Sequence, residues 1–154
     1  MLVYRMAKEK FSKDLSGQGA RIFSGRWNSI GHPMVYTSES RSLAAFELVV
    51  HLNLSLVPTK YMIIKINIPD KIDIERIDNR KLTAGWDSFP VNPITRKIGD
   101  DFIERNENLV LKVPSVVIPG DFNYLINPLH NYIKKVTIVS TEPFSYDNRI
   151  IKQN

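Results

Sequence analysis

The stretch from Gly25 to Leu52 places a single carboxylate, Glu47, inside an otherwise apolar segment. On an α-helix, Glu47 would lie at the edge of an apolar stripe formed by Leu43, Phe46, Val50 and Leu54. Further apolar residues cover much of the remaining circumference, so the pattern predicts a helix that is buried nearly all round. A lone carboxylate taken out of water is costly unless a partner compensates it. Glu47 therefore either has a structural partner or lies at the wall of a pocket for a polar substrate.

The length of 154 residues predicts one domain, spanning 1–154, with a core that needs no covalent staples. The chain has no cysteine, which excludes disulfides and thiolate metal sites. No apolar run has the length of a signal peptide or a membrane span, so we expect a cytoplasmic protein without a membrane partner. The formal charge of +5 suits an anionic partner such as a nucleotide, a nucleic acid or an acidic protein, but also an ordinary basic surface.

Short strand patterns alternate irregularly with helical ones along the chain. Strands are predicted at 2–6, 20–23, 34–37, 61–68, 71–77, 109–118 (interrupted at Pro114) and 135–140. Helices are predicted at 41–52, capped by Ser38 or Ser40, and at 94–105, entered through Asn92-Pro93. Residues 83–93 and 119–130 are predicted loops. Because there is no steady strand–helix alternation, the pattern favours an α+β fold.

Several common chemistries lack their sequence signatures. The three histidines have no paired metal-binding spacing, and no metal site is predicted. His51 lies four residues after Glu47, which favours a local hydrogen-bond partner or a satisfied buried histidine over a ligand role. Gly17-Gln18-Gly19 lacks the rest of a phosphate-binding loop, and the serine hydrolase elbow is absent.

What remains is a set of three side chains, Arg26, Tyr36 and Glu47. An arginine can grip a pyrophosphate or a carboxylate through two parallel hydrogen bonds. A tyrosine ring can stack on a flat heterocycle, and a desolvated glutamate can stabilise an oxocarbenium-like sugar centre. The set would suit a dinucleotide with a positively charged leaving base. By spacing alone, Arg26 and Glu47 could equally form a structural ion pair.

Longer motifs raise the odds of the functional reading. The runs GQGA, GRWN, VYTS and FELVVH are followed by GWDSFP and VPSVVIPGDFNYLINPLH. In this order they resemble the RES domain, the toxin component of RES–Xre toxin–antitoxin systems, over essentially the whole chain. The resemblance implies a fold related to ADP-ribosyltransferase toxins, with a mixed or antiparallel split sheet and a few helices. It also implies an activity on NAD+ as substrate, with no cofactor and with inorganic phosphate as one conceivable co-substrate.

The resemblance also implies roles for individual residues. Arg26 would hold the NAD+ phosphates or ribose, Tyr36 would pack on nicotinamide, and Glu47 would be the catalytic carboxylate. Further substrate contacts are implied for Arg5, Trp27, Ser115 and Asn127. Each of the last three has a plainer alternative: a packing anchor for Trp27, a backbone hydrogen bond for Ser115, and a turn before proline for Asn127.

Three functions therefore remain open. The first is a toxin that degrades NAD+ by hydrolysis or phosphorolysis until an Xre-like antitoxin neutralises it; nucleic acid would be met only through that antitoxin. The second is a mono-ADP-ribosyltransferase that modifies a cellular protein. The third is a nucleic-acid-binding protein or ribonuclease toxin, against which the scattered basic residues argue. A homodimer is expected only by analogy with the family.

Overall fold

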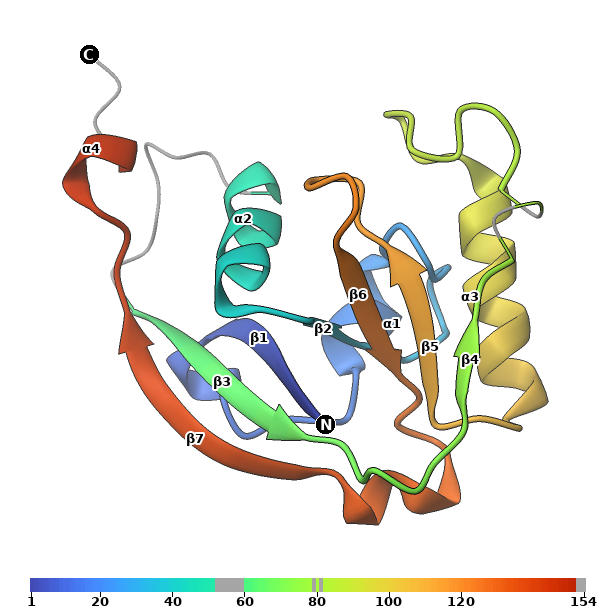
Figure 1. Cartoon of the computed structure of the whole chain (residues 1–154), viewed down its shortest axis with the longest axis horizontal. Coiled ribbons are helices and arrows are strands. Elements are labelled where there is room, and N and C mark those ends of the chain that lie inside the picture. Colours follow the sequence, from blue (N-terminus) through green and yellow to red (C-terminus); the bar gives the residue numbers. More distant parts are fainter. Residues whose placement is uncertain (52–59, 79, 81, 152–154) are drawn as a thin grey trace.

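The computed structural model describes residues 1–51, 60–78, 80 and 82–151. Its centre is one seven-stranded sheet in the order β4-β5-β6-β2-β1-β3-β7 (Figure 1). The strands are β1 (Leu2–Lys8), β2 (Val35–Ser38), β3 (Tyr61–Asn67), β4 (Ile74–Arg76), β5 (Val110–Pro114), β6 (Phe122–Ile126) and β7 (Thr137–Phe144). Only β4 and β5 pair in parallel among these neighbours. The predicted α+β class with a mixed sheet is confirmed.

Helices and 3-10 turns connect the strands or follow the last of them. They are η1 (Glu9–Phe11), α1 (Gln18–Phe23), α2 (Arg41–His51), α3 (Pro93–Arg105), η4 (Asn131–Lys135) and α4 (Asn148–Ile151). In the view of Figure 1, α2 lies to the left and α3 to the right of the group formed by β2, β6 and β5. No helix in the described part of the chain is long and apolar enough to cross a membrane.

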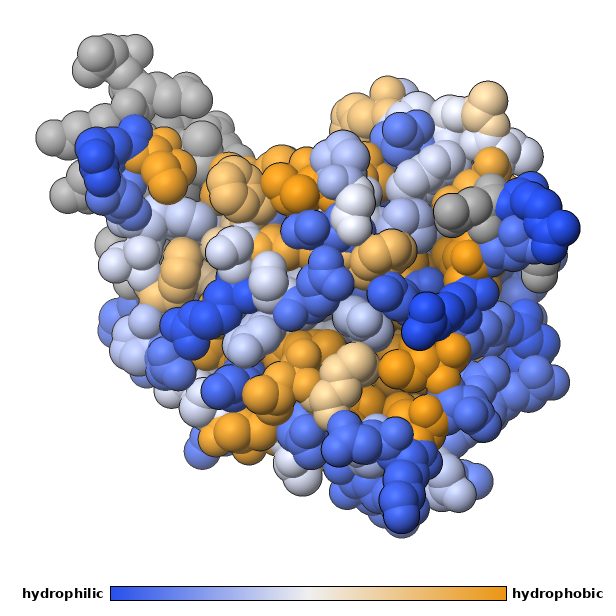
Figure 2. Space-filling model, viewed as in Figure 1, coloured by the Kyte–Doolittle hydropathy of each residue, from blue (hydrophilic) through white to orange (hydrophobic). Residues whose placement is uncertain are grey.

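Strand alternation divides the apolar residues between two cores. Cross-strand pairing puts Tyr36, Leu125 and Leu111 on one face, which we call the helical face because Leu125 and Leu111 pack there with Phe102 of α3. The opposite face carries a second core of ten buried residues: Val3, Ala7, Val35, Ile64, Ile66, Ile68, Leu109, Val110, Ile126 and Val136. In the view of Figure 2, apolar side chains gather in the lower half, around the place where Figure 1 marks the N-terminus.

Helix α3 begins and ends with specific local chemistry. The Asn92 side chain accepts the backbone N–H of Ile94 at 3.0 Å, and Pro93 occupies the first turn, where a missing N–H costs nothing. In the middle of the helix, Gly99 packs against the backbone of the loop after α1. A Cβ built on Gly99 would lie 1.6 Å from the carbonyl oxygen of Trp27, so only glycine fits there.

Helix α2 confirms its predicted start but not its predicted burial. The Ser40 hydroxyl oxygen accepts the backbone N–H of Leu43 at 3.1 Å, as expected of an N-cap. Leu43 is buried, whereas Phe46 and Val50 are 51% and 56% exposed. The helix packs on β1 and β2 through one side only, so the prediction of all-round burial is wrong. Leu54, the last member of the predicted stripe, lies outside the described residues, as does the side chain of His51.

Two further predictions are wrong. Residues 20–23 form part of α1 and not a strand; Ala20 packs into the helical-face core while Ile22 and Phe23 remain exposed. Residues 119–130 are not all loop, because they contain β6, which pairs with both β5 and β2. Its Gly and Pro neighbours suggested a loop, but tertiary pairing decided the conformation of this short segment.

Candidate active site

Glu47 is held on the helical face by two uncharged donors. Its Oε1 accepts the Ser115 hydroxyl at 2.9 Å and the Asn123 amide Nδ2 at 2.5 Å. The carboxylate is half-buried and has no ion-pair partner among the described residues. The alternative of a direct Arg26–Glu47 ion pair is therefore wrong. The two donors fix the position of the carboxylate without cancelling its charge.

The β5–β6 hairpin positions Ser115. This residue follows the last residue of β5, and its backbone N–H bonds to the carbonyl of Asp121 at 2.9 Å. Its hydroxyl oxygen accepts the backbone N–H groups of Val117 and Ile118, each at 3.1 Å. Because the hydroxyl oxygen already accepts two hydrogen bonds in the turn, its proton is available to donate to Glu47. Ser115 thus makes the backbone hydrogen bonds expected of a purely structural residue, and it also contacts Glu47, the proposed catalytic residue.

Asn123 links Glu47 to the centre of the sheet. It lies on β6 opposite Ser38 of β2, and its Oδ1 accepts the Ser38 hydroxyl at 2.7 Å. Since its Oδ1 accepts from Ser38, its Nδ2 is free to donate to Glu47. Sequence reasoning missed this residue. The available signal was the alternation in Phe122–Ile126, which places Asn123 and Leu125 on one face.

Arg26 secures the loop that carries Trp86. Its Nη1 donates to the carbonyl oxygens of Trp86 at 2.9 Å and Ser88 at 3.2 Å, and its Nη2 donates to Ser88 at 3.2 Å. Burial lowers the pKa of Arg26, while the charges of Asp87 and Glu47 raise it. Glu47 thus acts on Arg26 electrostatically without direct contact.

Tyr36 is fixed at the floor of the same face. Its hydroxyl donates to Asn28 Oδ1 at 2.7 Å and accepts the backbone N–H of Trp27 at 3.0 Å. Burial raises the pKa of Tyr36 well above its usual range, so the phenol is protonated at neutral pH. A Cβ on Gly25 would come within 2.5 Å of the Tyr36 hydroxyl, which accounts for glycine before Arg26.

Two predicted site residues lie elsewhere. In β1, Tyr4 pairs with Ser38 on the helical face, so Arg5 points to the opposite face, where its Nη1 donates to the carbonyl of Asp14. Asn127 follows the far end of β6, about 13 Å along the strand from Asn123. It bonds to Asn106 Oδ1 at 2.9 Å and caps the turn through the N–H of Leu129. The structure brings neither residue to Glu47.

Trp27 is enclosed. It is 2% exposed, and its ring lies 6.1 Å from that of Trp86, centroid to centroid. This placement matches a packing anchor, which ties the GRWN segment to the loop held by Arg26.

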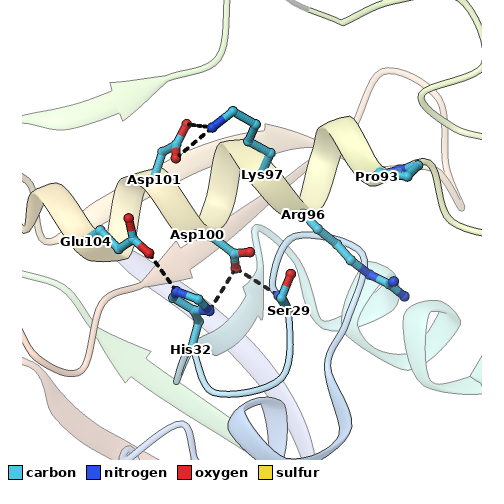
Figure 3. A pocket seen from close by; sticks show the side chains of 8 residues that line it. All are labelled: Ser29, His32, Pro93, Arg96, Lys97, Asp100, Asp101 and Glu104. Atoms are coloured by element: carbon cyan, nitrogen blue, oxygen red, sulfur yellow. Dashed lines mark hydrogen bonds and ion pairs between the residues drawn. The ribbon is translucent and has the colours of Figure 1, made fainter.

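A surface hollow of about 440 Å³ lies beside α3, and its lining includes Arg96 but not Glu47 (Figure 3). There His32 bridges two acids, with Nδ1 3.4 Å from Asp100 and Nε2 3.0 Å from Glu104. Asp100 also accepts the backbone N–H of Ser29 at 2.8 Å. Within the described residues, no group of three or more histidine, aspartate or glutamate side chains could hold a metal ion.

Comparison with known proteins identifies relatives over nearly the whole chain. The model of the family described as "RES domain" matches residues 2–147. A "Prs ADP-ribosylating toxin" of Sphingobium sp. (strain YBL2) is 37% identical, covering 91% of this chain and 88% of the relative. A "Toxin Res" of Photorhabdus laumondii is 34% identical, covering 99% and 98%. The fold is similar to a chain in the crystal structure of the M. tuberculosis MbcT-MbcA toxin-antitoxin complex. The TM-score is 0.72 with 16% identity, covering 94% of this chain and 84% of the other.

Proposed function

This chain belongs to the RES domain family, and we propose that it is the toxin of a toxin–antitoxin system that consumes NAD+ by cleaving the nicotinamide–ribose bond. The observation that carries the proposal is that only one oxygen of the Glu47 carboxylate is hydrogen-bonded within the described residues. Its Oε1 is fixed by Ser115 and Asn123, whereas its Oε2 makes no hydrogen bond with any described residue. One oxygen is therefore held in place while the other remains available to a ribose hydroxyl or a cationic centre.

A fixed, uncancelled carboxylate suits this bond cleavage. As the C–N bond breaks, its electron pair leaves with nicotinamide, which departs as a neutral base, and positive charge develops on the ribosyl carbon. An anion already in place stabilises that charge more in the transition state than in the ground state. The oxygen of water or phosphate then bonds to the same carbon. Water yields ADP-ribose and a released proton, and phosphate yields a phosphorylated ADP-ribose.

The other residues around Glu47 fit supporting roles. Tyr36 offers a neutral aromatic ring at the floor of the face, suited to packing on nicotinamide. Arg26 contributes positive charge that suits the diphosphate, and it orders the loop of Trp86 and Ser88 at the same time.

Mono-ADP-ribosylation of a protein is the second candidate. The name of the Sphingobium relative, "Prs ADP-ribosylating toxin", favours it. The first step would be the same, and a protein side chain would replace water or phosphate as acceptor. The similarity to a chain of a toxin–antitoxin complex supports a neutralising partner, which we propose to be an Xre-like antitoxin.

The test follows NAD+ by mass spectrometry after incubation with purified protein, with and without inorganic phosphate. Glu47→Gln keeps an acceptor for Ser115 and Asn123 but removes the charge, so we expect NAD+ loss to fall by about 100-fold or more with folding unchanged. Glu104→Gln, an exposed acid-to-amide change on α3, is the matched control and should retain full activity.

The products separate the candidates. Free or phosphorylated ADP-ribose supports the hydrolase or phosphorylase. ADP-ribose bound covalently to protein after addition of a cell lysate supports the transferase. Intact NAD+ in both conditions, or wild-type turnover by Glu47→Gln, would contradict the proposed function.

A further inference from the structure

Arg96 is a cation of α3 with an unused end. Its Nε donates to the carbonyl oxygen of Gly25 at 3.2 Å, and its Nη atoms make no hydrogen bond or ion pair with the residues that the structure describes. In Figure 3 its side chain extends away from His32, Asp100 and Glu104. The guanidinium is therefore anchored at one edge and open at the other, although its side chain is half-buried.

The neighbouring cations are already occupied. On the same helix, Lys97 pairs with Asp101 at 3.3 Å and Arg105 pairs with Glu75 at 2.6 Å. Asp100 stands four residues after Arg96, where it could form a helical ion pair, but it is bound to Ser29 and His32 instead.

The carbonyl group that holds Arg96 lies close to Tyr36. Gly25, whose carbonyl holds Arg96, packs directly on the Tyr36 hydroxyl. The charges of Arg96 and Arg26 both lower the pKa of Tyr36 against the larger effect of burial, which places both guanidiniums within electrostatic range of this phenol. Both Nη atoms of Arg26, however, already donate hydrogen bonds to the carbonyl oxygens of Trp86 and Ser88.

We propose that Arg96 is a second anion contact of this site, and that its Nη atoms bind oxygen atoms of the NAD+ diphosphate. The inference rests on the proposed function and assigns it a further substrate-binding residue. A guanidinium held through Nε presents its remaining N–H donors in a fixed fork, which matches two phosphate oxygens. Arg26 then contributes positive charge to the site while its Nη atoms hold the loop of Trp86 and Ser88.

The test measures binding of ADP-ribose, which carries the diphosphate but no scissile bond, and of nicotinamide, which carries no phosphate. For Arg96→Gln, calorimetry should show ADP-ribose binding about 10-fold weaker, a weaker dependence on salt, and unchanged nicotinamide binding. Glutamine can still donate to Gly25, so the fold should be kept. Arg96→Lys keeps the charge without the fork and should fall in between.

Lys97→Gln is the matched control, because it removes the same charge from the adjacent position on α3 and should leave ADP-ribose binding unchanged. Equal affinity of wild type and Arg96→Gln for ADP-ribose would overturn the inference and leave the proposed function standing. Equal loss of ADP-ribose and nicotinamide binding in Arg96→Gln would also overturn it, since that indicates a structural role. Failure of the wild type to bind either ADP-ribose or NAD+ would overturn both.

Discussion

The Ser115 hydroxyl has a single direction in which to donate, and Glu47 Oε1 lies in that direction at 2.9 Å. The direction is set by the turn after β5, where two backbone N–H groups occupy the hydroxyl oxygen. The serine therefore couples the geometry of a β-hairpin to the orientation of a carboxylate on α2.

Ser115→Ala should impair both activity and stability. It removes one donor from Glu47 and leaves two amide N–H groups without an acceptor, so we expect a loss of about 1–3 kcal/mol in the free energy of unfolding. Urea denaturation and NAD+ turnover would measure the two effects. Ser140→Ala removes a serine–glutamate bond at the exposed Glu142 and should change stability by no more than about 0.5 kcal/mol. An equally small effect at Ser115 would contradict this view of the hairpin.

Tyr36→Phe should change how stability depends on alkaline pH. Burial raises the pKa of Tyr36 in the folded state, so above about pH 10 the unfolded chain releases this proton while the folded one keeps it. The wild type therefore loses free energy of unfolding as the pH rises above about 10, and Tyr36→Phe should lose less. Tyr61 and Tyr146, whose pKa values burial also raises, contribute equally to both proteins and cancel in the comparison. Identical pH slopes in urea denaturation would contradict the assignment.

Arg26→Lys should loosen the loop at residues 83–93. A lysine ammonium lacks the rigid fork that reaches the carbonyls of both Trp86 and Ser88, so local opening should become easier. Hydrogen exchange should accelerate by about 10-fold within this loop. Arg41→Lys, which alters an exposed ion pair with Glu142, is the control and should leave the loop unchanged. Unchanged exchange in Arg26→Lys would show that the loop is held by other contacts.

Gly99→Ala should reverse the usual effect of this substitution in a helix. Alanine normally favours helix over glycine by up to about 1 kcal/mol. At Gly99 the new methyl group would collide with the Trp27 carbonyl, so we expect a destabilisation of about 2–4 kcal/mol. Gly19→Ala in α1 meets nothing within 4 Å and should leave stability unchanged or slightly higher. Similar denaturation midpoints for the two variants would contradict the close contact.

The sequence was sufficient where a signal is local and periodic. The start of α2 at its serine cap and the extent of α3 follow from capping residues and helical spacing. Residues 20–23 and β6 were predicted wrongly because their conformations depend on distant partners: Ala20 on the core beneath α3, and β6 on strands from both halves of the chain.

The candidate site divides in the same way. A carboxylate in an apolar segment pointed to Glu47 from sequence alone. The sequence alone could not show which residues donate hydrogen bonds to Glu47, because Ser115 and Asn123 come close to it only through the pairing of β6 with β2. The face on which Arg5 lies depends likewise on strand register, since successive residues of a strand point to opposite sides.

The pairing of β6 with β2 has a consequence for when this site can exist during synthesis. Glu47 and its partner Asn123 are separated by 76 residues, and the sheet order places the late strand β6 beside the early strand β2. A growing chain that has already presented Arg26, Tyr36 and Glu47 still lacks both donors that orient the carboxylate. The carboxylate site can therefore assemble only after Asn123 has been synthesised, and chains terminated before that residue lack it.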